Sequence, residues 1–293
     1  NPHPAGQVEH NIPELNGELL IGIQHKYKET VLFFPSQGQT CHAYCTFCFR
    51  WPQFVGMDEV KFAMKQGLVL VEYLRAHSEV TDLLITGGDP MVMKSEIFKA
   101  YIDSIIEADL PNLKTIRIGT KSLSFWPYRF ITDNDAIELL ETFKKIVDSG
   151  YHLALMAHFN HFNELKTPAV KEAVKRIQKT GAIIRTQSPI LKGINDEVFI
   201  WKTMWESQVK LGMVPYYMFM ARNTGAINYF AVTIVNAWKI FREAYSTVSG
   251  ICRTVRGPSM SADSGKILIS GISKINDEKV IALTFLQGRD SLW

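Results

Sequence analysis

The sequence has few cysteines, little net charge and no long apolar run. Only 4 of its 293 residues are cysteine, and disulfide frameworks are typical of shorter secreted chains. The formal net charge of +3 comes without a basic run, which does not favour a nucleic-acid partner. No stretch reaches the roughly 18 apolar residues of a bilayer span, and no signal-peptide pattern opens the chain. We therefore expect a cytoplasmic protein that binds neither nucleic acid nor membrane; whether a segment precedes Asn1 stays open.

Three of the four cysteines lie within eight residues. Cys41, Cys45 and Cys48 are separated by three and then two residues. Three thiolates on one loop can hold three irons of a [4Fe-4S] cluster and leave the fourth iron open to a small molecule. The alternative is a structural zinc site, but zinc usually takes four ligands in paired spacings. Cys252 stands alone, although His42 can be recruited as a fourth ligand, so the spacing favours the iron–sulfur interpretation.

Strand-like and helix-like segments alternate along the chain. This alternation predicts a parallel sheet with right-handed crossovers, and six units are too few for a closed eight-stranded barrel. The fold class is therefore α/β, an open, partial (β/α)6 TIM-like barrel. Two later apolar runs flank Asn276-Asp277 and predict a C-terminal β-hairpin extension. The predicted strands of the barrel are residues 31–34, 82–86, 115–120, 152–158, 182–187 and 213–219.

The helices between these strands are expected from caps and apolar periodicity. Asp58 is expected to cap a helix that includes Ala63 and Met64, and Thr167 a helix with Pro168 in its first turn. The resulting domain organisation is an N-terminal arm (1–30), a partial barrel (31–250) and a C-terminal β extension (251–293). Further helices are expected at residues 94–108, 137–147, 195–211 and 232–245.

Polar residues follow the predicted strands at their carboxyl ends, where parallel α/β folds bind ligands. This placement predicts an enzyme. Two adjacent glycines after the second strand let the backbone approach a ligand closely; the alternative is a tight turn capped by Asp89. The residues that follow the six strands in order are the cysteines, Gly87-Gly88-Asp89-Pro90, Lys121, His158-Phe159-Asn160-His161, Gln187-Ser188 and Arg222.

The cysteine spacing resembles that of radical S-adenosylmethionine (SAM) enzymes. With the other motifs, which run in family order from about residue 20 to 230, the chain resembles the lysine 2,3-aminomutase family. That resemblance implies the radical SAM type of barrel, a [4Fe-4S] cluster, SAM, pyridoxal phosphate (PLP) and an electron donor such as flavodoxin or ferredoxin. The family cleaves SAM reductively and moves an amino group from C2 to C3 of an amino acid. The motifs are Cys41 to Arg50, Gly87-Gly88-Asp89-Pro90, His158-Phe159-Asn160-His161, Gln187-Ser188, Gly193-Ile194-Asn195-Asp196 and Pro215-Tyr216-Tyr217.

The resemblance also implies roles for individual residues. Cys41, Cys45 and Cys48 would be the cluster ligands, and Arg50 would bind the substrate carboxylate through its fork of donors. The SAM and cofactor contacts would come from Gly87, Gly88, Asp89, Lys121, His158 and Gln187, where Lys121 replaces an arginine of the family.

Two departures from the family pattern bear on the substrate. Lysine-specific members carry an aspartate after Pro-Tyr-Tyr, whereas this chain has Arg222, which would repel a lysine side chain and attract an anion. We therefore expect a small-molecule, amino-acid-like substrate with a carboxylate. The family's PLP lysine is matched by Lys266, in a shortened glycine-containing run. A lysine that merely opens a β-strand is the alternative there.

Three functional hypotheses follow. The first is an aminomutase-like radical SAM enzyme with PLP, acting on an acidic or otherwise non-lysine amino acid. The second is a radical SAM enzyme without PLP on the same scaffold, and the third is a non-catalytic metal-binding module. Homo-oligomerisation stays open for all three.

Overall fold

A curved ten-stranded sheet organises the computed structural model, which describes residues 11–51, 63–65, 67–223, 225–262 and 264–288. Strands β4 to β10 are all parallel, and antiparallel strands flank them at both edges. The order is β12-β11-β10-β9-β8-β7-β6-β5-β4-β3. The bounds are β3 Ile23–Tyr27, β4 Thr30–Phe33, β5 Asp82–Ile85, β6 Thr115–Thr120, β7 His152–His158, β8 Ile183–Ile190, β9 Val214–Met220, β10 Arg256–Ala262, β11 Gly265–Ile275 and β12 Glu278–Gly288, with a separate pair β1 Glu14–Leu15 and β2 Glu18–Leu19.

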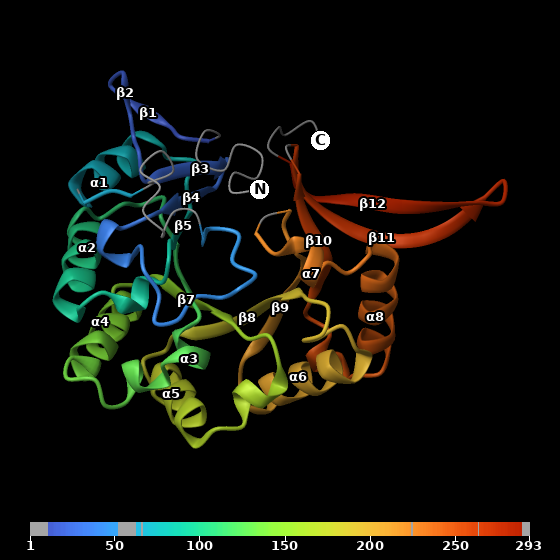
Figure 1. Ribbon diagram of the computed structural model, residues 1–293. Coiled ribbons are helices and arrows are strands. Elements are labelled where there is room, and N and C mark those ends of the chain that lie inside the picture. Colours follow the sequence, from blue (N-terminus) through green and yellow to red (C-terminus); the bar gives the residue numbers. More distant parts are fainter. Residues whose placement is uncertain (1–10, 52–62, 66, 224, 263, 289–293) are drawn as a thin grey trace.

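Helices cover the convex side of this sheet, so the molecule is an open arc rather than a closed ring (Figure 1). The cysteine-containing loop after β4, drawn in blue, lies inside the arc. None of the helices in the described ranges combines the length and apolarity needed to span a bilayer. The helices are α1 Gly67–Ala76, α2 Ser95–Glu107, α3 Ser122–Phe125, α4 Ala136–Asp148, α5 Pro168–Lys179, α6 Val198–Lys210, α7 Ile227–Phe230 and α8 Ile234–Ser246.

Local sequence explains the helix ends, as α5 illustrates. The Thr167 side chain accepts a hydrogen bond from the backbone N–H of Val170 at 3.2 Å, and Pro168 occupies the first turn. Val170 and Ile177 are buried on the sheet-facing side. Gly181 then follows with a φ of 88°, a left-handed conformation that ends the helix.

Strand alternation separates two environments. Ile116 and Ile118 of β6 are completely buried in the core between sheet and helices. Arg117, between them, therefore projects from the opposite, concave face. The same alternation places His158 of β7 and Gln187 of β8 on the concave side, and their register puts them beside Tyr217 of β9. Polar side chains thus line the inside of the arc.

The fold confirms the predicted partial α/β barrel, its six strands and the C-terminal hairpin. Two strands of the ten-stranded sheet were not predicted. β3 pairs with β4 inside the expected N-terminal arm, and β10 adds a seventh parallel strand beside β9. The division into arm, barrel and extension stays a prediction, although β10, β11 and β12 continue the barrel sheet.

One predicted helix begins later than expected. Met64 makes a parallel β-bridge with Pro35 rather than a helical turn, and α1 starts at Gly67. The reason is tertiary: Met64 exchanges backbone hydrogen bonds with Phe34 and Ser36 beside the end of β4. Asp58, the expected cap, lies outside the described residues.

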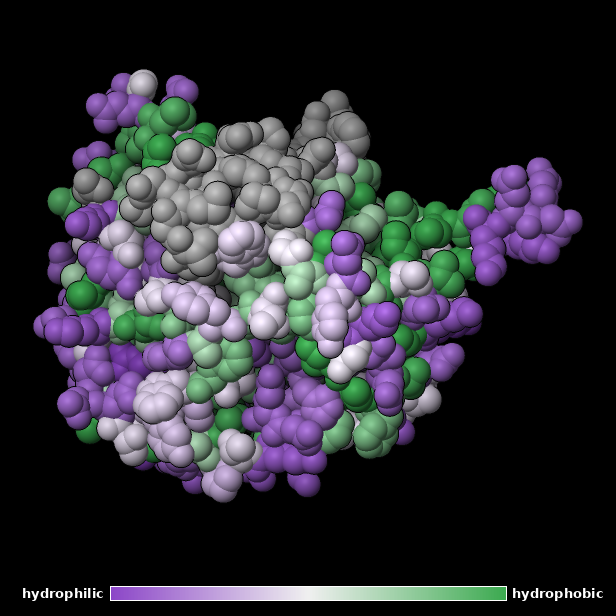
Figure 2. All heavy atoms as spheres, in the orientation of Figure 1, coloured by the Kyte–Doolittle hydropathy of each residue, from purple (hydrophilic) through white to green (hydrophobic). Residues whose placement is uncertain are grey.

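The hairpin of β11 and β12 projects from the body (Figure 2). Its tip is hydrophilic, while apolar residues line the part nearer the body. Leu283 is 49% exposed on this arm. The hairpin therefore begins as part of the barrel sheet and ends in solvent.

Candidate functional site

The glycine turn after β5 packs directly against the cysteine loop. A Cβ on Gly88 would lie 2.3 Å from the carbonyl oxygen of Thr40, and a Cβ on Gly87 would overlap the Gln39 side chain. The backbone N–H of Asp89 donates to the same Thr40 oxygen at 2.7 Å. The two glycines therefore allow two loops to meet, whether or not a ligand also approaches them.

Asp89 holds this turn in place. Its buried carboxylate accepts hydrogen bonds from the backbone N–H of Met91 (3.0 Å) and of Lys121 (2.8 Å), and from the hydroxyls of Thr120 (2.7 Å) and Ser122 (3.0 Å). Burial raises the pKa of Asp89, and these four donors oppose that shift. The carboxylate thus ties the end of β5 to the end of β6, and Asp89 also caps the short helix Pro90–Val92.

The three loop cysteines are half-buried free thiols. Burial raises the pKa of Cys45 to about 12, against the opposing charge of Lys121, and also raises the pKa values of Cys41 and Cys48. Cys48 donates its backbone N–H to the carbonyl of Cys45 at 3.0 Å, which turns the loop back on itself. Such thiols need a strong cationic partner to ionise, as iron in a cluster provides.

The spacing of the sulfurs does not match a single zinc ion. Tetrahedral zinc with Zn–S bonds of about 2.3 Å would hold its sulfurs roughly 4 Å apart. In the described part of the chain, these cysteines do not form a group whose ligand atoms all lie within 4.8 Å of one another. Cys252, the remaining cysteine, is buried in the core between α8 and β10. Three separated thiols therefore fit the corners of a larger cluster better than one metal ion.

Nε2 of His158 and Oε1 of Gln39, beside the cysteine loop, are among the buried polar atoms that have no hydrogen-bond partner in the described structure. The His158 ring meets Phe47 of the cysteine loop edge to face at 5.9 Å. Burial and the charge of Lys121 hold the pKa of His158 well below its usual range, so the ring is neutral. An unpaired buried polar atom is unfavourable by itself and is consistent with a ligand that supplies the partner.

Lys121 lies at the end of β6 and is engaged within the protein. Its Nζ is 3.4 Å from Oε1 of Glu164 and 3.1 Å from Oγ of Ser124, and it also donates to the backbone carbonyl of His158. With an exposed fraction of 8%, this ammonium is shielded from solvent. The structure thus gives Lys121 a carboxylate partner of its own, and its expected contact with SAM or another cofactor stays a prediction.

Basic residues gather on the concave side beyond the cysteine loop. The guanidinium carbons of Arg50 and Arg222 lie 5.1 Å and 4.8 Å from the centre of the Phe49 ring. Burial and the neighbouring charge of Arg222 lower the pKa of Arg50 to about 10. The two arginines that the sequence singled out for the substrate therefore share one aromatic ring.

Lys266 completes this group from the second residue of β11. Its Nζ lies 4.3 Å from the centre of the Tyr217 ring. Burial, together with the charges of Arg117, Arg256 and Arg222, lowers the pKa of Lys266 to about 8. Lys266 thus opens a β-strand and also reaches the concave surface. We call Arg50, Arg117, Arg222, Arg256 and Lys266 the cation cluster.

Arg117, Arg256 and Lys266 of the cation cluster differ in their partners. Arg117 pairs with Asp82, with Nε to Oδ1 at 2.7 Å. Arg256 donates to the hydroxyl of Tyr217 at 3.4 Å. Within the described ranges, neither Arg256 nor Lys266 forms an ion pair with a carboxylate. The concave surface near Tyr217 is therefore rich in positive charge.

The structure brings most of the predicted site residues to one end of the sheet. Sequence reasoning missed Gln39 and Arg256 as site candidates. Gln39 was detectable, because it lies two residues before Cys41. Arg256 was not, because β10 begins with Arg256-Gly257-Pro258, a run that carries no strand pattern.

No family model matches the chain. Among curated proteins, it is 37% identical to a putative L-lysine 2,3-aminomutase of Aquifex aeolicus over 85% of the chain and 64% of that protein. It is 28% identical to an L-lysine 2,3-aminomutase of Haemophilus influenzae, over 82% of the chain and 66% of that protein. It is 27% identical to a glutamate 2,3-aminomutase of Clostridioides difficile, over 85% of the chain and 52% of that protein. The chain therefore spans between half and two thirds of the length of these relatives.

Solved structures of low sequence identity share the fold. A radical SAM methyltransferase of Sphaerobacter thermophilus superposes with a TM-score of 0.54 at 13% identity, over 82% of this chain and 68% of that protein. The anSMEcpe structure with bound AdoMet gives a TM-score of 0.51 at 12% identity, over 74% of this chain and 59% of that protein. SuiB of Streptococcus suis, bound to S-adenosylmethionine, gives a TM-score of 0.50 at 10% identity, over 74% of this chain and 47% of that protein. The predicted resemblance to the lysine 2,3-aminomutases and the radical SAM type of fold are both confirmed.

Proposed function

We propose that this relative of the lysine 2,3-aminomutases is a radical SAM enzyme that acts on an amino acid with an anionic side chain, in an aminomutase-type reaction. The observation that carries the substrate class is the cation cluster. Curated relatives include proteins named for lysine and for glutamate, so the family accommodates both charges. The cation cluster of this chain favours a substrate with a negative side-chain charge, as in glutamate.

Cys41, Cys45 and Cys48 would hold the cluster, and their donor set and separation fit it. The cluster with SAM would supply a 5'-deoxyadenosyl radical that takes a hydrogen atom from the substrate. Next to the cysteines, His158 Nε2 and Gln39 Oε1 would form hydrogen bonds with SAM. Phe47, packed between His158 and Phe230 with ring separations of 5.9 Å on each side, would exclude water from that space.

Arg50 and Arg222 would bind and orient the two carboxylates of the substrate. Both guanidinium groups lie over Phe49, which limits their movement. Their mutual repulsion contributes to the lowered pKa of Arg50. A bound carboxylate relieves that repulsion, whereas the ammonium group of a lysine substrate increases it. The charge of the cluster thus selects for an acidic side chain.

The surroundings of Lys266 fit PLP. Its amine has a pKa of about 8 and is therefore partly neutral near physiological pH, as attachment to an aldehyde requires. Arg256 supplies positive charge nearby for a phosphate, and Tyr217 lies against the amine. PLP would supply a conjugated system that stabilises a substrate radical.

The test is anaerobic reconstitution with iron and sulfide, with and without PLP, followed by SAM and dithionite. We expect 5'-deoxyadenosine from the wild type and none from Cys45→Ser, because the cluster would lose a ligand. A fully loaded cluster that forms no 5'-deoxyadenosine with any acidic amino acid would overturn the proposal. Such a result would favour the non-catalytic metal-binding module.

The absorption spectrum separates the two catalytic hypotheses. PLP bound at Lys266 gives a visible band that Lys266→Ala abolishes, while Lys279→Ala, an exposed lysine of the same hairpin, retains it. Formation of 5'-deoxyadenosine without a PLP band would leave the radical SAM proposal standing and assign the chain to PLP-independent chemistry. The same result would exclude the aminomutase-type reaction.

A further inference from the structure

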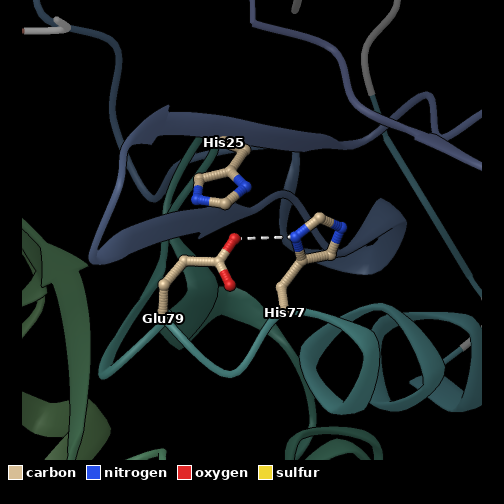
Figure 3. Close-up of side chains that lie close together, drawn as sticks. All are labelled: His25, His77 and Glu79. Atoms are coloured by element: carbon tan, nitrogen blue, oxygen red, sulfur yellow. Dashed lines mark hydrogen bonds and ion pairs between the residues drawn. The ribbon is translucent and has the colours of Figure 1, made fainter.

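We propose that His25, His77 and Glu79 form a zinc site separate from the cysteine loop. Among the described residues, these three form the only group of His, Cys, Asp or Glu side chains whose ligand atoms all lie within 4.8 Å of one another. Figure 3 shows both imidazoles gathered around the Glu79 carboxylate. Two imidazoles and one carboxylate are a zinc ligand set that leaves a fourth position for water.

The three residues come from separate segments at the amino ends of the strands. His25 lies on β3 opposite Val31, near the beginning of β4. His77 follows α1 directly, and Glu79 stands three residues before β5. The cysteine loop follows the other end of β4, so zinc here would not meet the reacting substrate. It would instead join β3 to the connection between α1 and β5.

The hydrogen bonds of His25 leave the correct nitrogen for a metal. Its Nε2 lies 3.1 Å from the carbonyl oxygen of Lys28, which can only accept, so Nε2 carries the hydrogen. Its Nδ1 therefore has a lone pair and accepts the hydroxyl of Tyr73 at 2.6 Å. A ligating histidine whose second nitrogen donates to a backbone carbonyl is the usual arrangement in metal sites. Zinc would bind this lone pair in place of the Tyr73 hydroxyl, which would keep its hydrogen and lose this acceptor.

His77 and Glu79 are already paired, with Nδ1 to Oε1 at 2.9 Å. The hydrogen bond from His77 lowers the pKa of Glu79, so the carboxylate is ionised. Zinc would replace the proton between these two atoms, and that proton would move to Nε2 of His77 or to solvent. The side chains of His77 and Glu79 are 32% and 35% exposed, which gives an ion access from solvent.

The loop that carries these two ligands is fixed from behind. The side-chain amide of Asn112 donates to the carbonyls of Val80 (2.8 Å) and His77 (3.3 Å). The His77 ring packs on Tyr73 with centroids 4.2 Å apart. The ligands are therefore held near one another before any metal binds, which reduces the entropy lost on binding.

The experiment is calorimetric titration of zinc chloride into protein whose iron–sulfur cluster is already loaded, since free cysteines also bind zinc. We expect one equivalent to bind the wild type, and His77→Ala and Glu79→Gln to weaken binding by more than about 10-fold. His152→Ala, an exposed histidine on β7, is the matched control and should bind like the wild type. No binding by the loaded wild type, or undiminished binding by His77→Ala and Glu79→Gln, would overturn the proposal.

Zinc K-edge X-ray absorption of the loaded protein identifies the ligands even where a variant folds poorly. We expect only nitrogen and oxygen neighbours at about 2.0–2.2 Å. Sulfur neighbours at about 2.3 Å would place the zinc on cysteine instead and contradict the proposal. Neither measurement depends on the reaction that the enzyme catalyses.

Discussion

Two regions of the molecule bury charge, and they do so in opposite ways. Asp89 accepts hydrogen bonds from four donors, and its charge is shared among them. In the cation cluster, like charges face one another, and the pKa of Lys266 falls to about 8 as a result of burial and three arginines. The first region is satisfied within the protein and fixes its shape. The second gathers positive charge, which fits the proposed site for an anion.

The largest effect should come from the satisfied region. Asp89→Ala leaves buried donors without an acceptor, and we expect the free energy of unfolding to fall by at least about 3 kcal/mol in urea titrations. Asp148→Ala, which breaks an exposed pair with Lys144, should lose less than about 1 kcal/mol. Equal losses in the two variants would show that the Asp89 network does not hold the turn.

In the cation cluster, removal of a charge should have the opposite effect and raise the free energy of unfolding. The pKa of Lys266 lies below the ordinary value of 10.5, so the folded protein binds fewer protons than the unfolded chain between about pH 8 and 10.5. The burial of Lys266 therefore lowers the free energy of unfolding by its full amount at pH values below 8. This penalty disappears as the pH rises to 10.5. We expect Lys266→Met to raise the free energy of unfolding at pH 7 by about 2 kcal/mol. The gain should largely vanish at pH 10.5.

Lys279→Met is the control for this sign, because Lys279 is exposed on the same hairpin. It should change stability little at either pH. A destabilised Lys266→Met protein at pH 7 would mean that the ammonium group is compensated, and the contrast between the two regions would fail.

The contact between the glycine turn and the cysteine loop should be intermediate in effect. Gly88→Ala places a Cβ 2.3 Å from the Thr40 oxygen, so the loops must separate. We expect a loss of about 2 kcal/mol in unfolding free energy and a lower iron content after reconstitution. Gly250→Ala, with no atom within 4 Å of its Cβ, should behave like the wild type. If Gly88→Ala takes up the full iron content, the packing of the glycine turn is not needed for cluster assembly.

The smallest expected effect is stabilisation by a free ligand. L-Glutamate at about five times its dissociation constant should stabilise the protein by about 1 kcal/mol relative to L-lysine at equal ionic strength. The difference should disappear in Arg222→Ala, because the cluster loses one cation. Thermal unfolding measures the stabilisation by each amino acid in the wild type and in Arg222→Ala. Equal stabilisation by the two amino acids in the wild type would remove the charge preference.

The sequence was sufficient where information is local. Apolar runs such as residues 31–34 and 213–219 predicted buried strands, and Thr167-Pro168 and Gly181 marked the ends of α5. The spacing of Cys41, Cys45 and Cys48 predicted iron–sulfur ligands from the loop alone, and that role stays a prediction. These features depend on neighbours within a few residues, which sequence patterns record.

The rest depended on contacts between distant segments. β3 has a mixed polar sequence, Ile-Gln-His-Lys-Tyr, and becomes a strand because β4 offers it an edge. β10 contains Gly257-Pro258 and becomes a strand through parallel pairing with β9. The cation cluster gathers residues from the cysteine loop, β6, the loop after β9, β10 and β11. Only the curvature of the sheet brings their charges together.

The proposed charge preference is measured as 5'-deoxyadenosine formation by the reconstituted wild type and by Arg222→Asp, each with L-glutamate and with L-lysine. We predict that the wild type responds to L-glutamate and not to L-lysine. In Arg222→Asp, the response to L-glutamate should fall at least about 10-fold, because the carboxylate meets a like charge. A wild-type enzyme that responds to L-lysine and not to L-glutamate would show that the cation cluster does not select an anionic substrate.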